Sequence, residues 1–115
     1  MVRVYGIKNC DSVKKALRYL DAHGVAYAFH DFKSSPVGRE TIEEWGHKSG
    51  VTSLFNTKGT TYRTLGLKSL NLTDADKIEW MSSHNLLIKR PVIEYEDRLL
   101  VGFDPSQYEG TFSHE

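Results

Sequence analysis

The first third of the chain alternates between strand and helix periodicity, which strongly restricts its fold. Val2 and Val4 alternate with polar residues as in a short β-strand. Residues 11–20 have helical spacing, and Gly24 is suited to end the helix. The run 25–32 then predicts a second strand. A helix between two strands predicts a parallel pair joined by a right-handed crossover. The apolar positions of the predicted helix are Val13, Ala16, Leu17 and Leu20.

The last quarter of the chain predicts a hairpin followed by a helix. Residues 92–95 and 98–101 are apolar runs separated by two residues, which favours a tight β-hairpin. Asp104 is a good N-cap, and Pro105 suits the first position of a helix. The tail from 110 to 115 is expected to be loose.

The stretch between these two halves has a helical texture from about 38 to 85. Residues 39–45 predict a short helix that buries Ile42 and Trp45, while 51–55 is ambiguous between strand and helix. Thr73 is a candidate N-cap for a helix that ends near 83–85. Residues 86–91 are expected to form an extended approach to the proline at 91.

This order of elements favours one α/β domain over residues 1–115. A β-α-β unit, a helical insertion and a β-β-α unit follow one another, which is the order of a thioredoxin-like fold. We therefore predict a mixed four-stranded sheet with a helical insertion at about 38–85. The length agrees with a single domain that has its own core.

The composition is that of an ordinary globular protein, with 39% hydrophobic and 26% charged residues. Fifteen basic and fifteen acidic residues cancel, so no nucleic-acid or membrane surface is predicted. No apolar run approaches the roughly 20 residues of a membrane span, and no leader pattern follows Met1, so we expect a cytoplasmic protein. The five histidines lack metal-ligand spacing, and no metal site is expected.

Cys10 is the only cysteine, which excludes an internal disulfide and every CxxC pair. It lies where the first predicted strand gives way to the first helix. Unpaired N–H groups and the helix dipole favour a thiolate at that position, and the thiolate is the reactive form. The alternative is a small buried hydrophobe. Polar neighbours argue against that alternative, and we interpret Cys10 as a nucleophile. These neighbours are Lys8, Asn9, Asp11 and Ser12.

Three segments together resemble the arsenate reductase (ArsC)/Spx family. They are Tyr5-Gly6-Ile7-Lys8-Asn9-Cys10-Asp11-Ser12-Val13-Lys14-Lys15-Ala16, then Asn56-X-X-Gly59-X-X-Tyr62-Arg63, and then Leu87-Ile88-Lys89-Arg90-Pro91 before a hairpin. The first segment is most similar to the YffB branch of the family. The resemblance covers nearly the whole chain, and it implies a thioredoxin-like fold with a helical insertion.

The resemblance also implies a catalytic set of Cys10, Arg63 and Arg90. Cys10 would be the thiol nucleophile, and the two arginines would bind an anionic group. Pro91 would be the cis-proline of thioredoxin-like proteins and would expose the backbone of Arg90 to a thiol substrate. Glutathione would serve as co-substrate, with no bound cofactor.

Simpler structural readings exist for each of these residues. Arg63 can pair with a surface acid, Arg90 can extend over the sheet edge, and Pro91 can be an ordinary strand-entry proline. Asn9 is either a loop residue or a hydrogen-bond donor toward thiolate or substrate. Lys8 is a weaker substrate-binding candidate that adds positive potential near the sulfur.

Two departures from the family pattern bear on function. Residues 99–104 contain no arginine, whereas the arsenate reductases carry a third one there, so efficient arsenate reduction is not expected. Val13 stands where a CxxC switch of the Spx regulators needs its second cysteine. The sequence therefore predicts a glutathione-dependent thiol reductase with a single nucleophilic cysteine. The alternative is a non-enzymatic, Spx-like regulator that binds RNA polymerase or another protein.

Overall fold

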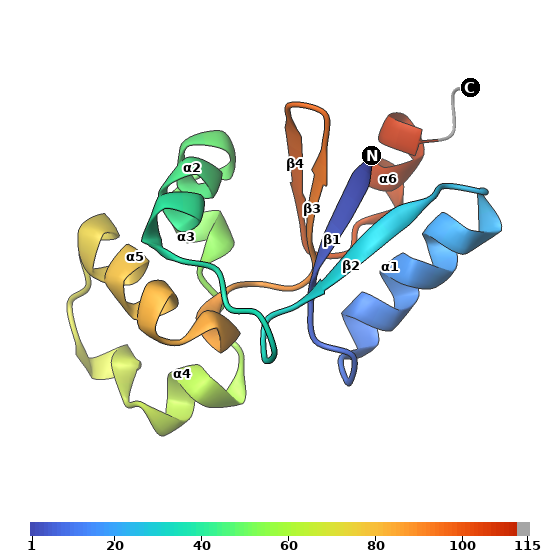
Figure 1. Ribbon diagram of the computed structural model, residues 1–115. Helices are drawn as coiled ribbons and strands as arrows, with labels where there is room; N and C mark the ends of the chain where they lie inside the picture. Colours follow the sequence, from blue (N-terminus) through green and yellow to red (C-terminus); the bar gives the residue numbers. More distant parts are fainter. Residues whose placement is uncertain (113–115) are drawn as a thin grey trace. The chain divides into compact units, whose positions relative to one another are not determined.

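A computed structural model describes residues 1–112, and the chain divides into two compact units (Figure 1). The first, called here the sheet unit, comprises Met1–Ser34 and the chain from Arg90 onward. The second, called the helical unit, comprises Ser35–Lys89. The helical insertion predicted at 38–85 lies inside the helical unit, which begins and ends a few residues further out.

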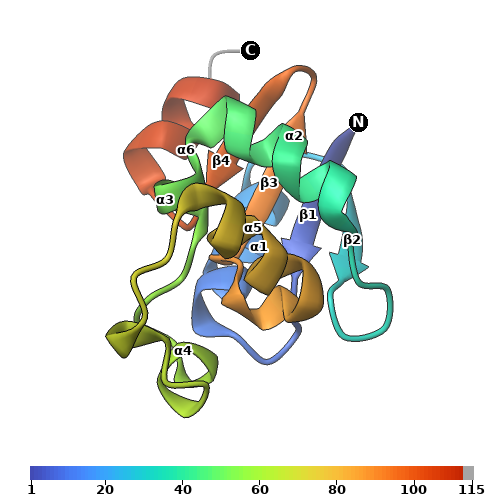
Figure 2. The same ribbon diagram turned by 90° about the vertical axis from the view of Figure 1, so that its left-hand side faces the viewer.

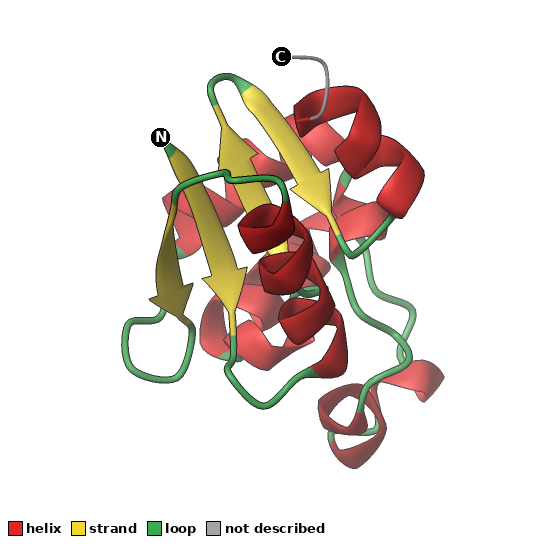
Figure 3. Ribbon diagram, turned by 90° about the vertical axis from the view of Figure 1, so that its right-hand side faces the viewer, coloured by secondary structure: helices red, strands yellow, loops and turns green. Residues whose placement is uncertain are grey.

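The sheet unit contains one mixed four-stranded sheet with the strand order β2-β1-β3-β4. β1 pairs in parallel with β2 and antiparallel with β3, which pairs antiparallel with β4. This arrangement confirms the predicted β-α-β and β-β-α halves. Both helices of the unit lie on the same face of the sheet (Figure 3). The elements are β1 (Val2–Gly6), α1 (Asp11–Ala22), β2 (Tyr27–Asp31), β3 (Val92–Tyr95), β4 (Arg98–Val101) and α6 (Pro105–Phe112).

The core of the sheet unit follows from the strand register. Val4 pairs with Ile93, and Ile93 pairs with Leu100, so three apolar side chains form a row across the sheet. Leu20 of α1 and Tyr108 of α6 are completely buried in the same cluster. Burial of large apolar side chains of this kind stabilises a fold by roughly 1.5–3 kcal/mol each.

A glycine at the end of β1 lets α1 approach the sheet closely. A Cβ atom on Gly6 would lie 2.7 Å from Cγ2 of Val13, a completely buried residue in the first turn of α1. Such a separation is shorter than a van der Waals contact, so a larger residue would push the helix away. At the other end of α1, Gly24 has a φ of +66° and donates its N–H to the Asp21 carbonyl. The predicted glycine stop is confirmed.

The expectation of a loose tail is wrong for residues 110–112. These residues belong to α6, and Thr111 and Phe112 are buried. The Phe112 ring packs against Tyr95 of β3 at 5.3 Å between ring centroids, which holds the last turn against the sheet. Residues 113–115 of the expected tail lie outside the described residues.

The helical unit consists of short helices and turns. α2 packs against both α3 and α5 (Figure 2), and completely buried Ile42 and Trp45 confirm the predicted inner face of α2. Thr73 caps α5 as predicted, and its hydroxyl accepts the Asp76 N–H at 3.1 Å. The elements are α2 (Arg39–Ser49), α3 (Val51–Leu54), α4 (Thr60–Thr64), α5 (Asp74–Ser83) and the 3-10 turns η1 (Leu67–Ser69) and η2 (Asn85–Leu87).

Two segments of the helical unit resolve or correct the sequence-based expectations. The ambiguous stretch 51–55 is helical up to Leu54, and Phe55 forms an isolated bridge with Ile88. The extended approach predicted for 86–91 is wrong at its start, because residues 85–87 form the turn η2. The buried Asn85 amide explains the turn, since it donates to the Met81 carbonyl at 2.9 Å and so ties η2 to the end of α5.

Candidate functional site

Cys10 is the N-cap residue of α1, as the sequence predicted. Its backbone is extended, with φ −141° and ψ 124°, and its carbonyl accepts the first helical hydrogen bond from the Lys14 N–H at 2.9 Å. Its side chain makes no capping hydrogen bond, and the residue is half-buried. The sulfur therefore lies at the positive end of a 12-residue helix without being used to cap it.

The strand register places Arg90 and Pro91 at the same edge of the sheet as the loop that leads to Cys10. Tyr5 near the end of β1 pairs with Val92, the first residue of β3. The loop leaves β1 at this edge, and Arg90-Pro91 enters β3 there. The Arg90–Pro91 peptide bond is cis, which confirms the predicted cis-proline. Lys8 and Asn9 in the loop are exposed, Arg90 is half-buried and Pro91 is buried.

The residues that follow β4 reach this edge as well. The Gly102 N–H donates to the Pro91 carbonyl at 2.8 Å, so the chain after β4 is joined to the start of β3. Phe103 packs edge-on against Tyr108, with ring centroids 5.1 Å apart. The Tyr108 hydroxyl donates to the Gly102 carbonyl at 2.9 Å. Burial, with the nearby Asp104 carboxylate, raises the pKa of Tyr108 well above its ordinary value, so the hydroxyl remains a donor.

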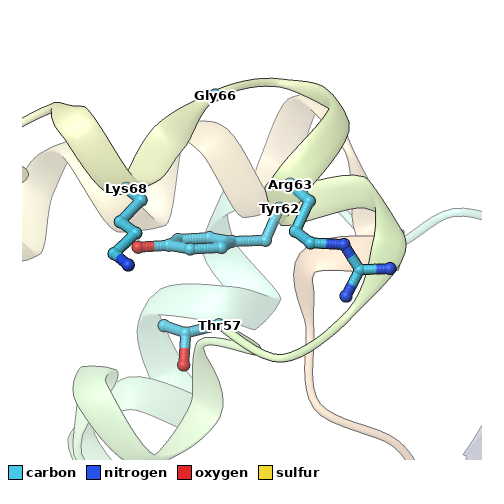
Figure 4. A pocket seen from close by; sticks show the side chains of 5 residues that line it. All are labelled: Thr57, Tyr62, Arg63, Gly66 and Lys68. Carbon is cyan, nitrogen blue, oxygen red and sulfur yellow. The ribbon is translucent and has the colours of Figure 1, made fainter.

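Arg63 belongs to the helical unit, where it lines a pocket together with other residues of that unit. It is an exposed residue of α4 and lines a pocket of about 630 Å³ (Figure 4). Its role toward Cys10 stays a prediction from the sequence. The motif that precedes it shapes the turn before α4: the Asn56 Oδ1 accepts the Lys58 N–H, and a Cβ on Gly59 would meet the Asn56 amide nitrogen at 2.8 Å.

Sequence reasoning did not single out Thr57 and Lys68, which line the same pocket as Arg63. The signal that could have found Lys68 is a local charge imbalance. The chain has no Asp or Glu between Glu44 and Asp74, although this stretch contains several basic residues.

Two other kinds of feature are absent from residues 1–112. No group of three histidine, cysteine or carboxylate side chains there could hold a metal ion. The helices in that part of the chain are too short or too polar to traverse a bilayer.

Comparison with known proteins agrees with the fold and identifies the family. A glutaredoxin from Archaeoglobus fulgidus superimposes with a TM-score of 0.52 over 99% of this chain and 86% of the other, at 16% identity. This likeness shows a thioredoxin-like fold. The ArsC family model matches residues 5–111, and the chain belongs to the ArsC family.

Individual relatives resemble the chain over nearly its full length. A solved structure of a YffB protein is 42% identical, with a TM-score of 0.92 over 97% of this chain and 99% of the other. A Haemophilus influenzae protein named only as uncharacterized is 33% identical over 98% of this chain and all of its own length. The global transcriptional regulator Spx of Streptococcus agalactiae is 24% identical over 93% of this chain and 80% of its own.

Proposed function

We propose that the protein is a thiol reductase that uses Cys10 as its nucleophile and glutathione as its co-substrate. The observation that carries the proposal is the position of Cys10 at the N-terminus of α1, half-buried and with its side chain free of a capping bond. Unpaired N–H groups at a helix N-terminus stabilise negative charge, and a thiolate is the form of cysteine that attacks sulfur. Membership of the ArsC family, whose relatives include arsenate reductases, supports a thiol-dependent reductase.

The proposed reaction has two thiol–disulfide exchanges. In the first, the Cys10 thiolate attacks the glutathione-bound sulfur of a mixed disulfide, its S–S bond breaks, and the substrate leaves as a thiolate. In the second, the thiolate of another glutathione attacks the Cys10–glutathione disulfide, which releases Cys10 thiolate and oxidised glutathione. The substrate sulfur leaves with the electron pair of its broken S–S bond, the second glutathione thiolate supplies the pair for the new S–S bond, and the two glutathione units leave as their disulfide. An external thiol is required because the chain has no second cysteine.

The residues at the same sheet edge have supporting roles in this proposal. Arg90 and exposed Lys8 would attract the glutathione carboxylates, and Asn9 would donate a hydrogen bond to the thiolate or substrate. The Arg90–Pro91 backbone would pair with the peptide part of glutathione. Arg63 is assigned an anion-binding role by the family resemblance alone.

We further propose that arsenate is a poor substrate. The chain segment after β4 presents Gly102 and Phe103 where a third arginine is expected for arsenate reduction, and the Phe103 ring is committed to packing on Tyr108. Loss of one charge-stabilising group typically costs about 10²–10³ in rate. Gly102 has a φ of +81°, so Phe103→Arg, which requires no strained backbone, is the better gain-of-function variant. Robust arsenate turnover by the parent protein that Cys10→Ser abolishes would contradict this assignment.

Mass spectrometry of the intact protein after incubation with oxidised glutathione tests the proposed nucleophile. We expect one glutathione adduct on Cys10, removed by reduced glutathione and absent in Cys10→Ser. Alkylation at pH 6 should be faster than that of free cysteine. Absence of the adduct, together with an ordinary alkylation rate, would refute a catalytic Cys10.

A second candidate function is protein binding without catalysis. The similarity to a global transcriptional regulator over 93% of this chain favours it as the alternative. A pull-down with RNA polymerase, using the parent protein and Cys10→Ser, separates the two. Equal recovery of polymerase by both proteins, without glutathione adduct formation, would favour the regulator.

A further inference from the structure

The pocket in the helical unit has an unbalanced charge. It is lined by two cationic side chains and two hydroxyl-bearing ones, and no acidic residue among residues 1–112 lines it. Its volume of about 630 Å³ falls within the range of small-molecule sites. The lining residues are Thr57, Tyr62, Arg63, Gly66 and Lys68.

The two cations are not neutralised by their surroundings. Within residues 1–112, the side chains of Arg63 and Lys68 form no ion pair or hydrogen bond. The sequence accounts for this, because the nearest acidic residues along the chain are Glu44 and Asp74. Two positive groups that share a pocket without an internal counterion attract anions to it.

The shape of the pocket separates the two charges. In Figure 4 the Tyr62 ring lies between them, with the Lys68 ammonium near its hydroxyl end and the Arg63 guanidinium on the other side. The Thr57 side chain lies across from the face of this ring. The ring itself is held edge-on by Phe55, with ring centroids 5.9 Å apart.

The backbone between the two cations forms a fixed turn. Gly66 has a φ of +66°, a left-handed conformation that glycine adopts without strain. It ends α4 and lets the chain turn into η1, which carries Lys68. The Gly66 N–H donates to the Arg63 carbonyl at 3.0 Å, which closes this turn.

We infer that this pocket binds a small molecule with two anionic groups at opposite ends of a short spacer. The planar guanidinium of Arg63 would hold one carboxylate or phosphate through two parallel hydrogen bonds. The Lys68 ammonium would hold the other group, with the Tyr62 hydroxyl as an additional donor. The spacer would contact the Tyr62 ring. This site shares Arg63 with the anion-binding role that the family resemblance implies, but it includes neither Cys10 nor Arg90.

An NMR titration of the full-length, isotopically labelled protein tests the inference. Succinate supplies two carboxylates and pyrophosphate supplies two phosphates, while sodium chloride at matched ionic strength is the reference. We expect saturable shifts of the amides of residues 57 and 62–68 with at least one of these two compounds and not with chloride. Tighter binding of succinate would identify a dicarboxylate site, and tighter binding of pyrophosphate a diphosphate site.

Charge-neutralising variants distinguish binding in this pocket from non-specific attraction of anions to the whole acid-free stretch between Glu44 and Asp74. Lys68→Gln should weaken binding about two- to fivefold, the effect expected of one exposed ion pair. The double variant Arg63→Gln/Lys68→Gln should abolish saturation. Lys48→Gln is the matched control, since Lys48 lies in the same acid-free stretch but does not line the pocket. Cys10→Ser should bind like the parent, whatever its reactivity.

Two results would overturn the inference. One is the absence of any saturable shift beyond that caused by chloride. The other is a loss of affinity in Lys48→Gln as large as that in Lys68→Gln, because binding would then reflect the charge of the whole stretch.

Discussion

The sheet unit and the helical unit bury their side chains in different ways. In the sheet unit, apolar residues from three strands and two helices meet in one cluster, where Val4, Leu20 and Ile93 are completely buried. The helical unit also buries apolar side chains completely, among them Ile42, Trp45 and Met81, but a buried side-chain amide adds specific polar contacts there. The buried Asn85 side chain accepts the Val37 N–H at 2.7 Å and donates to the Val37 carbonyl at 3.2 Å.

This difference suggests which kind of substitution each unit tolerates least. A cluster of apolar side chains loses stability mainly when a cavity is created. A chain segment held by a buried amide loses it when a backbone group is left without a partner.

Leu20→Ala should have the largest effect, because Leu20 is completely buried between α1 and the sheet. We expect the free energy of unfolding to fall by about 2–5 kcal/mol, the range for large-to-small changes in a core. Urea denaturation of the full chain measures it. Leu17→Ala is the control, since Leu17 is only half-buried, and its loss should be clearly smaller. Equal losses would show that the cluster is not the main source of stability.

Asn85→Leu tests the polar contacts of the helical unit. The substitution keeps the number and branching of the side-chain heavy atoms but leaves the Val37 N–H buried without its acceptor, which should cost about 1–3 kcal/mol. Hydrogen exchange of the Val37 amide should accelerate. Asn71→Leu at an exposed position should change stability by less than about 0.5 kcal/mol. A neutral Asn85→Leu would mean that apolar packing holds both units in the same way.

Thr73→Ala removes the cap of α5 and should cost about 1 kcal/mol. The cap also gives stability a pH dependence, because hydrogen bonds from the Thr73 backbone and side chain lower the pKa of Asp76. A lowered folded-state pKa contributes stability that is present above the ordinary carboxyl pKa and lost as the pH falls through the folded value. Denaturation from pH 6 down to pH 2 should show this loss in the parent and a smaller loss in Thr73→Ala, because alanine removes the side-chain contribution but keeps the backbone N–H that donates to the Asp76 carboxylate.

Glu96→Gly should produce the smallest change, and it should be stabilising. Among the residues that the structure describes, Glu96 is the non-glycine residue with a positive φ, +57°, in the turn between β3 and β4. Glycine removes about 1–2 kcal/mol of strain from the left-handed backbone conformation, but it also loses more conformational entropy on folding. We therefore expect the free energy of unfolding to rise by less than about 1 kcal/mol. Asp97→Gly, at the neighbouring position, should give no gain. A loss in Glu96→Gly would show that the glutamate side chain stabilises the hairpin.

The features predicted correctly depend on residues close together in the chain. The helix after Cys10, the stop at Gly24, the cap at Thr73 and the hairpin after Pro91 each follow from a pattern a few residues long. Because these patterns act through neighbouring backbone groups, the sequence alone carries them. The position of Cys10 at a helix N-terminus is of this kind, and so is the order of elements that indicated a thioredoxin-like fold.

The remaining features depend on residues far apart in the chain, and only the tertiary structure decides them. The Asn85 side chain at the start of the turn 85–87 also binds the backbone of Val37, 48 positions away, which no local pattern predicts. Residues 110–112 are ordered because Phe112 finds Tyr95 across the sheet unit. Burial and strand register are properties of the packed chain, so no local pattern specifies which distant side chains will meet.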